Sequence, residues 1–120
     1  MKRNNLSGWL DLIFLRLSEK EYDHGTTSGA IDLARTTAAV HIVTLGGNPT
    51  FTLSGWPSRG ECALGLWLYA GGDNVVTMPA GVYWEGGAVP TLTSASWDFV
   101  LFEYREDAKV FGTARLDFAP

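Results

Sequence analysis

The segment between residues 77 and 93, TMPAGVYWEGGAVPTLT, constrains the fold more than any other part of the chain. It places two prolines, three glycines and one tryptophan in a fixed order. Proline cannot donate to a sheet ladder, and adjacent glycines favour a tight turn, so the segment must follow a loop path. None of these residue types does bond-making chemistry at this spacing. We therefore expect one ordered structural loop, packed on a β-sheet and held by Pro79, Trp84, Gly86, Gly87 and Pro90.

From residue 30 onward the side chains follow the period of two that is typical of β-strands. We expect strands over residues 30–33, 38–45, 50–54, 62–70, 75–78, 97–104 and 109–118. The sequence GGNP at 46–49 predicts a hairpin turn, and REDA at 105–108 predicts a second one. Residues 62–70 are apolar on both faces, which indicates a central strand. About seven or eight short antiparallel strands at regular spacing predict an all-β sandwich, jelly-roll-like in its connections.

The first part of the chain has a different pattern. Its apolar residues recur at helical spacing, and they are Leu6, Trp9, Leu10, Ile13, Phe14 and Leu17. Residues 6–22 are therefore expected to form a helix with Ser7 as a plausible N-cap, although residues 10–12 and 15–17 also alternate as a strand would. The polar sequence DHGTTSG at 23–29 is typical of a linker. We expect an N-terminal helix or arm with its linker over residues 1–28 and a β-sandwich domain over 29–120.

Charge and length exclude several classes of protein. The chain has 120 residues and a net charge of −4, and its nine basic residues are scattered, which argues against nucleic-acid binding. Lys2 and Arg3 precede an apolar run at 9–17, but Asp11 and Arg16 interrupt that run, and it is too short to span a bilayer. We expect neither an export signal nor membrane insertion.

Groups capable of chemistry are few and dispersed. The single cysteine, Cys62, lies in an apolar run and is expected to be buried, and His41 is expected in a strand facing solvent or an interface. Neither His41 nor His24 has metal-ligand spacing. Asp98, at the start of a strand, is expected to bond backbone amides, and three other acids are expected to be solvated in turns: Glu61, Asp73 and Glu85. We expect no catalytic residue, no metal and no cofactor.

The aromatic residues allow two interpretations. Flat aromatic rings can stack on the faces of sugars, but tryptophan and tyrosine also fill cores and oligomer interfaces. We favour the second interpretation, core and interface packing, for this chain. Trp56 and Trp84 lie beside proline or glycine in loops and are the better exposed tryptophans. The candidate ligand-facing rings are Trp56 and Tyr83.

The order of residues in the loop carries a resemblance to a known family. Its members have a segment of the form (W/M)-P-x-x-V-x-W-x-G-G-x-x-P-x-L-T, then an Asp-led apolar strand and an aromatic-Gly pair. The matching residues here are Met78, Pro79, Val82, Trp84, Gly86, Gly87, Pro90, Leu92 and Thr93, the strand at 97–102 and the pair Phe111-Gly112. Over about residues 29–118 the chain resembles the small C-terminal β-domain of tail-fibre and minor structural proteins of tailed bacteriophages and prophages. It departs from the family at Met78, where tryptophan is commoner, and at the turn Arg105-Glu106-Asp107.

The resemblance implies a non-enzymatic bacteriophage virion structural protein, made in the host cytoplasm. A small β-domain with an apolar arm suits a capsid decoration or cement protein, or a small tail-fibre or head-fibre subunit, with capsid or tail proteins as partners. We expect a homo-oligomer, a homotrimer, through an apolar interface formed by Trp9, Leu10, Ile13, Phe14 and Leu17. The alternatives are a carbohydrate- or receptor-binding module that contacts host surface glycan, and a depolymerase fragment.

Overall fold

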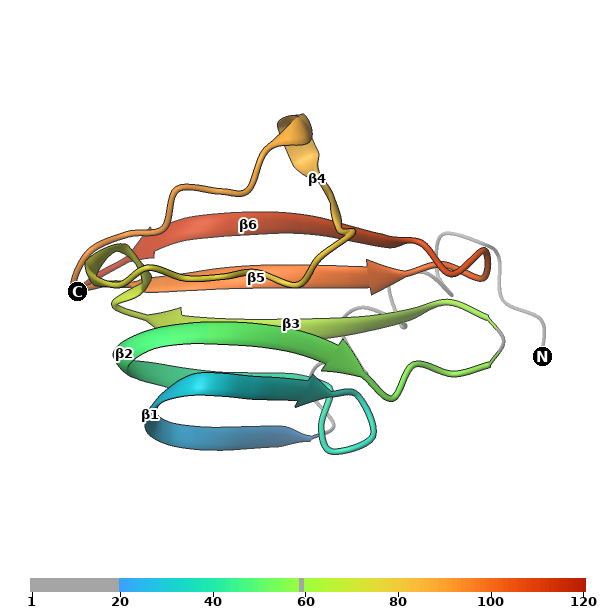
Figure 1. Ribbon diagram of the computed structural model, residues 1–120, viewed down its shortest axis with the longest axis horizontal. Helices are drawn as coiled ribbons and strands as arrows, with labels where there is room; N and C mark the ends of the chain where they lie inside the picture. Colours follow the sequence, from blue (N-terminus) through green and yellow to red (C-terminus); the bar gives the residue numbers. More distant parts are fainter. Residues whose placement is uncertain (1–19, 59) are drawn as a thin grey trace.

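A computed structural model describes residues 20–58 and 60–120. In these residues six strands form one mixed sheet in the order β1-β2-β3-β5-β6-β4 (Figure 1). The strands are β1 (Glu21–Ala34), β2 (Val40–Ser54), β3 (Cys62–Tyr69), β4 (Tyr83–Trp84), β5 (Trp97–Tyr104) and β6 (Val110–Phe118). Two short 3₁₀ turns, η2 (Gly71–Asp73) and η3 (Glu85–Gly87), follow β3 and β4. The predicted all-β class is confirmed.

The predicted jelly-roll-like antiparallel sandwich is wrong, because three of the five strand pairings are parallel. β1 pairs with β2, β2 with β3, and β4 with β6 in parallel, whereas β5 pairs antiparallel with β3 and β6. A parallel pair ordinarily needs a crossover of a dozen residues or more. Here β1 and β2 are long and double back on themselves (Figure 1). The end of β1 therefore returns close to its start, and the short connection at 35–39 suffices to begin β2 in parallel.

The bend in β2 occupies residues 46–49, where the sequence predicts a hairpin turn. That prediction is wrong, because β2 runs without interruption from Val40 to Ser54. The glycines have another use: a Cβ on Gly46 would lie 3.1 Å from the Thr26 side chain, and one on Gly47 would lie 3.1 Å from that of Ser28. They allow β1 and β2 to stay close while both strands curve.

Residues 23–29 are a bent part of β1, so the prediction of a linker there is wrong. Gly25 and Gly29 have φ values of 71° and 75°, a conformation that glycine adopts without a steric penalty, and the pairing with β2 shifts register here. The Asp23 carboxylate accepts a hydrogen bond from the Gly25 amide at 2.8 Å. Of the helix predicted over 6–22, residues 21 and 22 belong to β1, and residues 6–19 lie outside the described residues.

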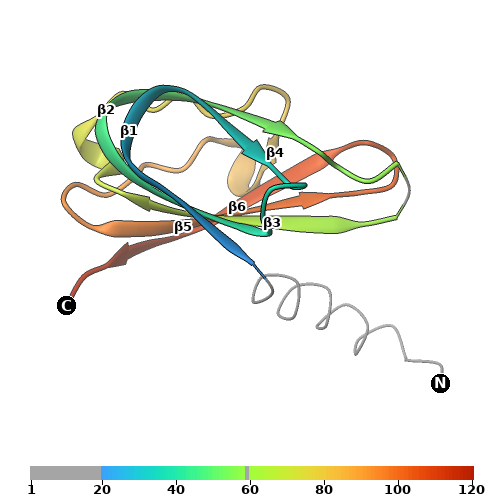
Figure 2. The same cartoon turned by 90° about the horizontal axis from the view of Figure 1, so that it is seen from below.

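The second halves of β1 and β2 curl over one face of β3 and β5, which we call the inner face (Figure 2). The loop at 75–92 covers the same face, although only Thr77 of the predicted strand at 75–78 forms a ladder contact, a bridge to Thr50. The core between these layers consists of Ile31, Leu33, Val43, Leu45, Phe51, Leu64, Leu66, Leu68, Met78, Val100 and Phe102. The molecule is therefore a single sheet that covers part of itself, with a core like that of a sandwich.

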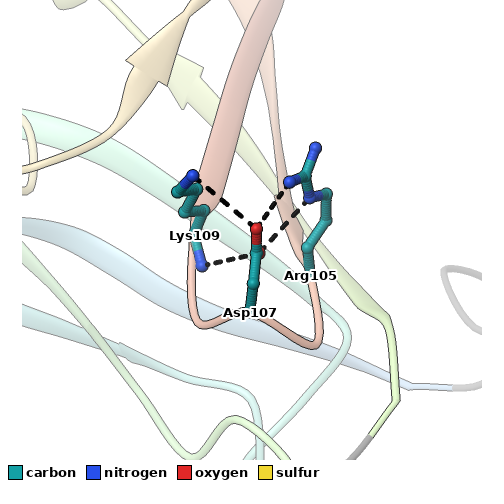
Figure 3. A network of polar contacts seen from close by, with 3 residues as sticks. All are labelled: Arg105, Asp107 and Lys109. Atoms are coloured by element: carbon teal, nitrogen blue, oxygen red, sulfur yellow. Dashed lines mark hydrogen bonds and ion pairs between the residues drawn. The ribbon is translucent and has the colours of Figure 1, made fainter.

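The C-terminal hairpin agrees with the sequence. β5 and β6 pair antiparallel around residues 105–108, as predicted. Asp107 in this turn pairs with the Arg105 guanidinium at 2.5 Å and with the Lys109 ammonium at 3.8 Å (Figure 3). The Arg105 hydrogen bond holds the pKa of the Asp107 carboxyl below its usual value.

Candidate interaction surface

The face of β3 and β5 opposite the core is also apolar, and we call it the outer face. Alternation along the strands turns Trp67 and Tyr69 of β3 away from the core, together with Phe99 and Trp97 of β5, their partners in register. All four side chains are half-buried. With Ile42 of β2 and Phe118 of β6 they form a continuous surface that we call the aromatic strip.

Ring contacts hold the aromatic strip together. The centroid of the Trp67 ring lies 4.7 Å from that of Phe99 and 5.4 Å from that of Phe118, and the Tyr69 and Trp97 rings lie 5.1 Å apart. Such spacings are typical of favourable aromatic pairs. A shallow hollow of about 330 Å³ lies in this strip and is lined by Glu21, Ile42, Trp67, Trp97 and Phe118. A fixed, clustered aromatic surface of this kind commonly marks an interaction site.

A second hollow, of about 310 Å³, lies around Tyr83 and is lined by Tyr83, Trp84, Glu85, Glu103, Phe111, Gly112 and Thr113. We call it the Tyr83 hollow. The Tyr83 side chain is 54% exposed, and its ring stacks on that of Phe111 at 5.3 Å. Burial raises the pKa of the Glu103 carboxyl, and the negative charge of Glu61 raises it further.

The predicted structural loop packs on the inner face. Trp84 is half-buried there, and its ring lies 5.8 Å from that of Phe102. Gly112 of β6 makes room for this ring, because a Cβ at that position would lie 2.5 Å from it. Gly86 and Gly87 have φ values of 76° and 81°, which confirms the turn predicted for them. Pro79 and Pro90, which precede and follow this turn in the sequence, are both half-buried.

The other predicted interaction residues are scattered. The Trp56 ring packs against the core and stacks on that of Tyr104 at 5.0 Å. Tyr83 pairs in register with Phe111 and Glu103, and Glu103 points to the face opposite that of Tyr104, because side chains alternate along β5. The two candidate ligand-facing rings thus do not form one platform. The apolar interface residues Trp9, Leu10, Ile13, Phe14 and Leu17 lie outside the described residues.

His41 is fully buried, which corrects the prediction that it faces solvent or an interface. It lies on the inner face of β2, where its Nε2 donates to the Ala34 carbonyl oxygen at 3.0 Å and its Nδ1 lies 2.8 Å from Nε2 of His24. Two histidines 17 residues apart meet because β1 and β2 pair in parallel, which the sequence pattern did not reveal. Burial lowers the pKa of both imidazoles. Repulsion from His41 lowers the pKa of His24 further.

Asp98 has the structural role that the sequence predicts. It is fully buried and its carboxylate accepts hydrogen bonds from the backbone amides of Thr93 at 2.7 Å and Asp117 at 2.9 Å. Cys62 is buried, as predicted. Asp73 accepts hydrogen bonds from the Ser94 hydroxyl and the Ala95 amide in a surface turn, and the Ser94 bond is the main cause of its lowered pKa.

Over residues 20–58 and 60–120, no three histidine, cysteine or acidic side chains come together as metal ligands would. Nor does this part of the chain contain a helix of the length and apolar character needed to cross a membrane. Comparison of the chain with protein-family models, with curated proteins and with solved structures finds no match. In the described residues, the two hollows and the aromatic strip are the features that could bind a partner.

Proposed function

We propose that the protein is a non-enzymatic structural component of a bacteriophage particle that assembles with copies of itself through the aromatic strip. The proposal rests on the aromatic strip. On β3 and β5 this apolar surface is formed by Trp67, Tyr69, Trp97 and Phe99, and no described strand covers it. Burying aromatic area removes it from water and stabilises association. A second copy of this chain is the occupant we propose for it.

The shape of the surface supports contact between copies. Its rings come from adjacent strands of one sheet and have ring partners of their own, so little side-chain freedom is lost when they are buried. In a closed cyclic oligomer every subunit buries an equivalent surface, so no copy of the strip would stay exposed. A homotrimer is the state we propose, with the capsid or the tail as the site of attachment.

The placement in a phage particle depends on the loop at 77–93 and on its resemblance to the β-domains of tail-fibre and minor structural proteins. The packing of Trp84 against the core and the tight turn at Gly86 and Gly87 support a scaffold role for that loop. We therefore propose that the part of the loop packed on the core stabilises the fold, and that the opposite face of the sheet mediates assembly.

Light scattering on the full chain tests self-association. We expect a trimer that dissociates when Phe118, 45% exposed at the rim of the aromatic strip, is replaced in Phe118→Lys. The matched control is Val75→Lys, because Val75 is 73% exposed and lies outside the strip. A monomeric wild-type protein, or a trimer that survives Phe118→Lys, would refute assembly through this face. Co-sedimentation with purified capsids and with purified tails then identifies the attachment site, and binding to neither would refute the placement in the particle.

The exposed Tyr83 ring, half-enclosed by two glutamates, favours a second candidate function, a carbohydrate- or receptor-binding module. Self-association would then be incidental, and the Tyr83 hollow would be the functional site. Binding of host surface glycan that is lost in Tyr83→Ala but kept in Phe118→Lys distinguishes this function from assembly.

A further inference from the structure

The Tyr83 hollow combines aromatic rings with two carboxylates. Tyr83 of β4, Phe111 of β6 and Glu103 of β5 stand side by side in the register of the sheet. Glu85 follows β4 directly, and one of its carboxylate oxygens accepts a hydrogen bond from the Thr113 hydroxyl at 2.8 Å. Both glutamates line the hollow, and no basic side chain does. The wall of the hollow is therefore aromatic and negatively charged.

Two basic side chains of the neighbouring turn show what these rings attract. The Arg105 guanidinium lies 4.6 Å from the centroid of the Phe111 ring, and the Lys109 ammonium lies 5.9 Å from that of Tyr83. The faces of aromatic rings attract cations at such distances. Asp107 lies between them and pairs with both (Figure 3), and neither basic side chain lines the hollow.

The charge of Glu103 is poorly balanced in the described structure. Its carboxylate is half-buried and has Glu61 nearby as a second negative charge, and these two causes raise its pKa. A cation placed in the hollow would stabilise the ionised form, because opposite charges at close range favour it. Binding of a cation and ionisation of Glu103 are therefore expected to promote each other.

We infer that the Tyr83 hollow binds a lysine or arginine side chain of a partner protein. The aliphatic stem packs against the Tyr83 and Phe111 rings, and the charged group lies between Glu85 and Glu103. A long basic side chain suits such a site because its stem is apolar and its head is cationic. The inference does not rest on assembly through the aromatic strip, since the hollow is formed within one copy.

NMR titration of the full-length protein tests the inference with four probes at millimolar concentration. They are blocked lysine, blocked arginine, blocked norleucine, which keeps the stem without the charge, and methyl glucoside. We expect the first two to shift the resonances of Tyr83 and Thr113, and the other two to leave them in place. Binding should weaken at acidic pH as Glu103 is protonated.

Variants separate charge from shape. Glu103→Gln keeps the size of the side chain and should weaken binding of the basic probes up to about fivefold, the loss expected for one ion pair on a protein surface. It should also reduce the pH dependence of binding, because residue 103 no longer takes up a proton. Glu85→Gln, which keeps an acceptor for Thr113, should weaken binding by a similar factor and serves if Glu103→Gln fails to fold. The matched control is Glu106→Gln, at an exposed position of the turn outside the hollow.

Three results would overturn the inference. The first is no shift with either basic probe, and the second is equal binding by lysine and norleucine. The third is a shift with methyl glucoside that Glu103→Gln leaves intact, which would identify a sugar site. Self-association of each variant, measured by light scattering, shows separately whether assembly is affected.

Discussion

The two faces of the sheet are built from the same strands and have similar apolar character, but their surroundings differ. On the inner face, Leu66 and Phe102 are fully buried beneath the returning halves of β1 and β2 and the loop. On the outer face, Trp67 and Phe99 are only half-buried, and the Trp67 ring packs on those of Phe99 and Phe118. Strand composition alone thus does not decide which face becomes the core. The path of the rest of the chain decides it.

The comparison also explains where buried polar groups are tolerated. Asp98 and His41 both lie on the inner face, and both are fully buried. Each has hydrogen-bond partners within the described structure, two backbone amides for Asp98 and a carbonyl and an imidazole for His41. Burial of a polar side chain is costly unless such bonds replace those to water.

A matched pair of substitutions on β5 should give the largest difference. Phe102→Ala on the inner face should lower the free energy of unfolding by about 3–5 kcal/mol, because it leaves a cavity in the core. Phe99→Ala on the outer face should lower it by less than about 2 kcal/mol, since less of that ring is removed from water. Urea denaturation at a low protein concentration measures both. Equal losses would contradict the distinction between a core face and an interaction face.

Asp98→Asn should destabilise the inner face by about 1–3 kcal/mol. An asparagine side chain has only one acceptor oxygen, so one of the two amides, of Thr93 or Asp117, would face an NH₂ group. Thermal unfolding of this variant, beside Glu106→Gln as the exposed control, measures the effect. A melting temperature unchanged from wild type would show that the two bonds contribute nothing.

The paired histidines should give the smallest effect, a loss of stability in mild acid. Burial lowers the pKa of His24 and His41 in the folded protein, so the unfolded chain binds protons more readily. Their contribution is complete above about pH 6.5, the unperturbed histidine pKa, and is lost as the pH falls below it. We expect the urea concentration at the unfolding midpoint to decrease as the pH is lowered from 7 to 5. The decrease should be smaller in His24→Gln. An identical pH slope in this variant would assign the acid sensitivity to other groups.

The sequence predicts the C-terminal half of the fold well and the N-terminal half poorly. The central strand β3, the β5–β6 hairpin and the turn at Gly86-Gly87 all follow from local residue types, because a hairpin or a tight turn is specified by neighbours in the chain. In β1 and β2 the same residue types led to wrong predictions of a linker and a turn. The glycines and polar residues at 23–29 and 46–49 form bends in continuous strands. Whether a glycine pair ends a strand or bends it depends on what approaches it in space.

The candidate site was predictable only in its parts. The alternation in residues 62–70 shows that β3 is apolar on both faces, and the pairing of Trp67 with Phe99 follows from the antiparallel register of β3 and β5. The Tyr83 hollow depends on the parallel pairing of β4 with β6, two strands separated by 25 residues of chain, and no local pattern signals that contact. The meeting of His24 with His41 depends on parallel pairing in the same way.

The order of strands in the sheet has a consequence for how the chain reaches this state. Within the described residues only β5 and β6 are joined as a hairpin, and every other pairing closes a longer stretch of chain. Long closures slow folding, because entropy is lost before the contacts that offset it are made. β3 lies between β2 and β5, and β5 is synthesised after both of the others. A nascent chain on the ribosome must therefore hold one edge of β3 unpaired until the hairpin emerges, and during that interval the apolar faces of β3 are most exposed to aggregation.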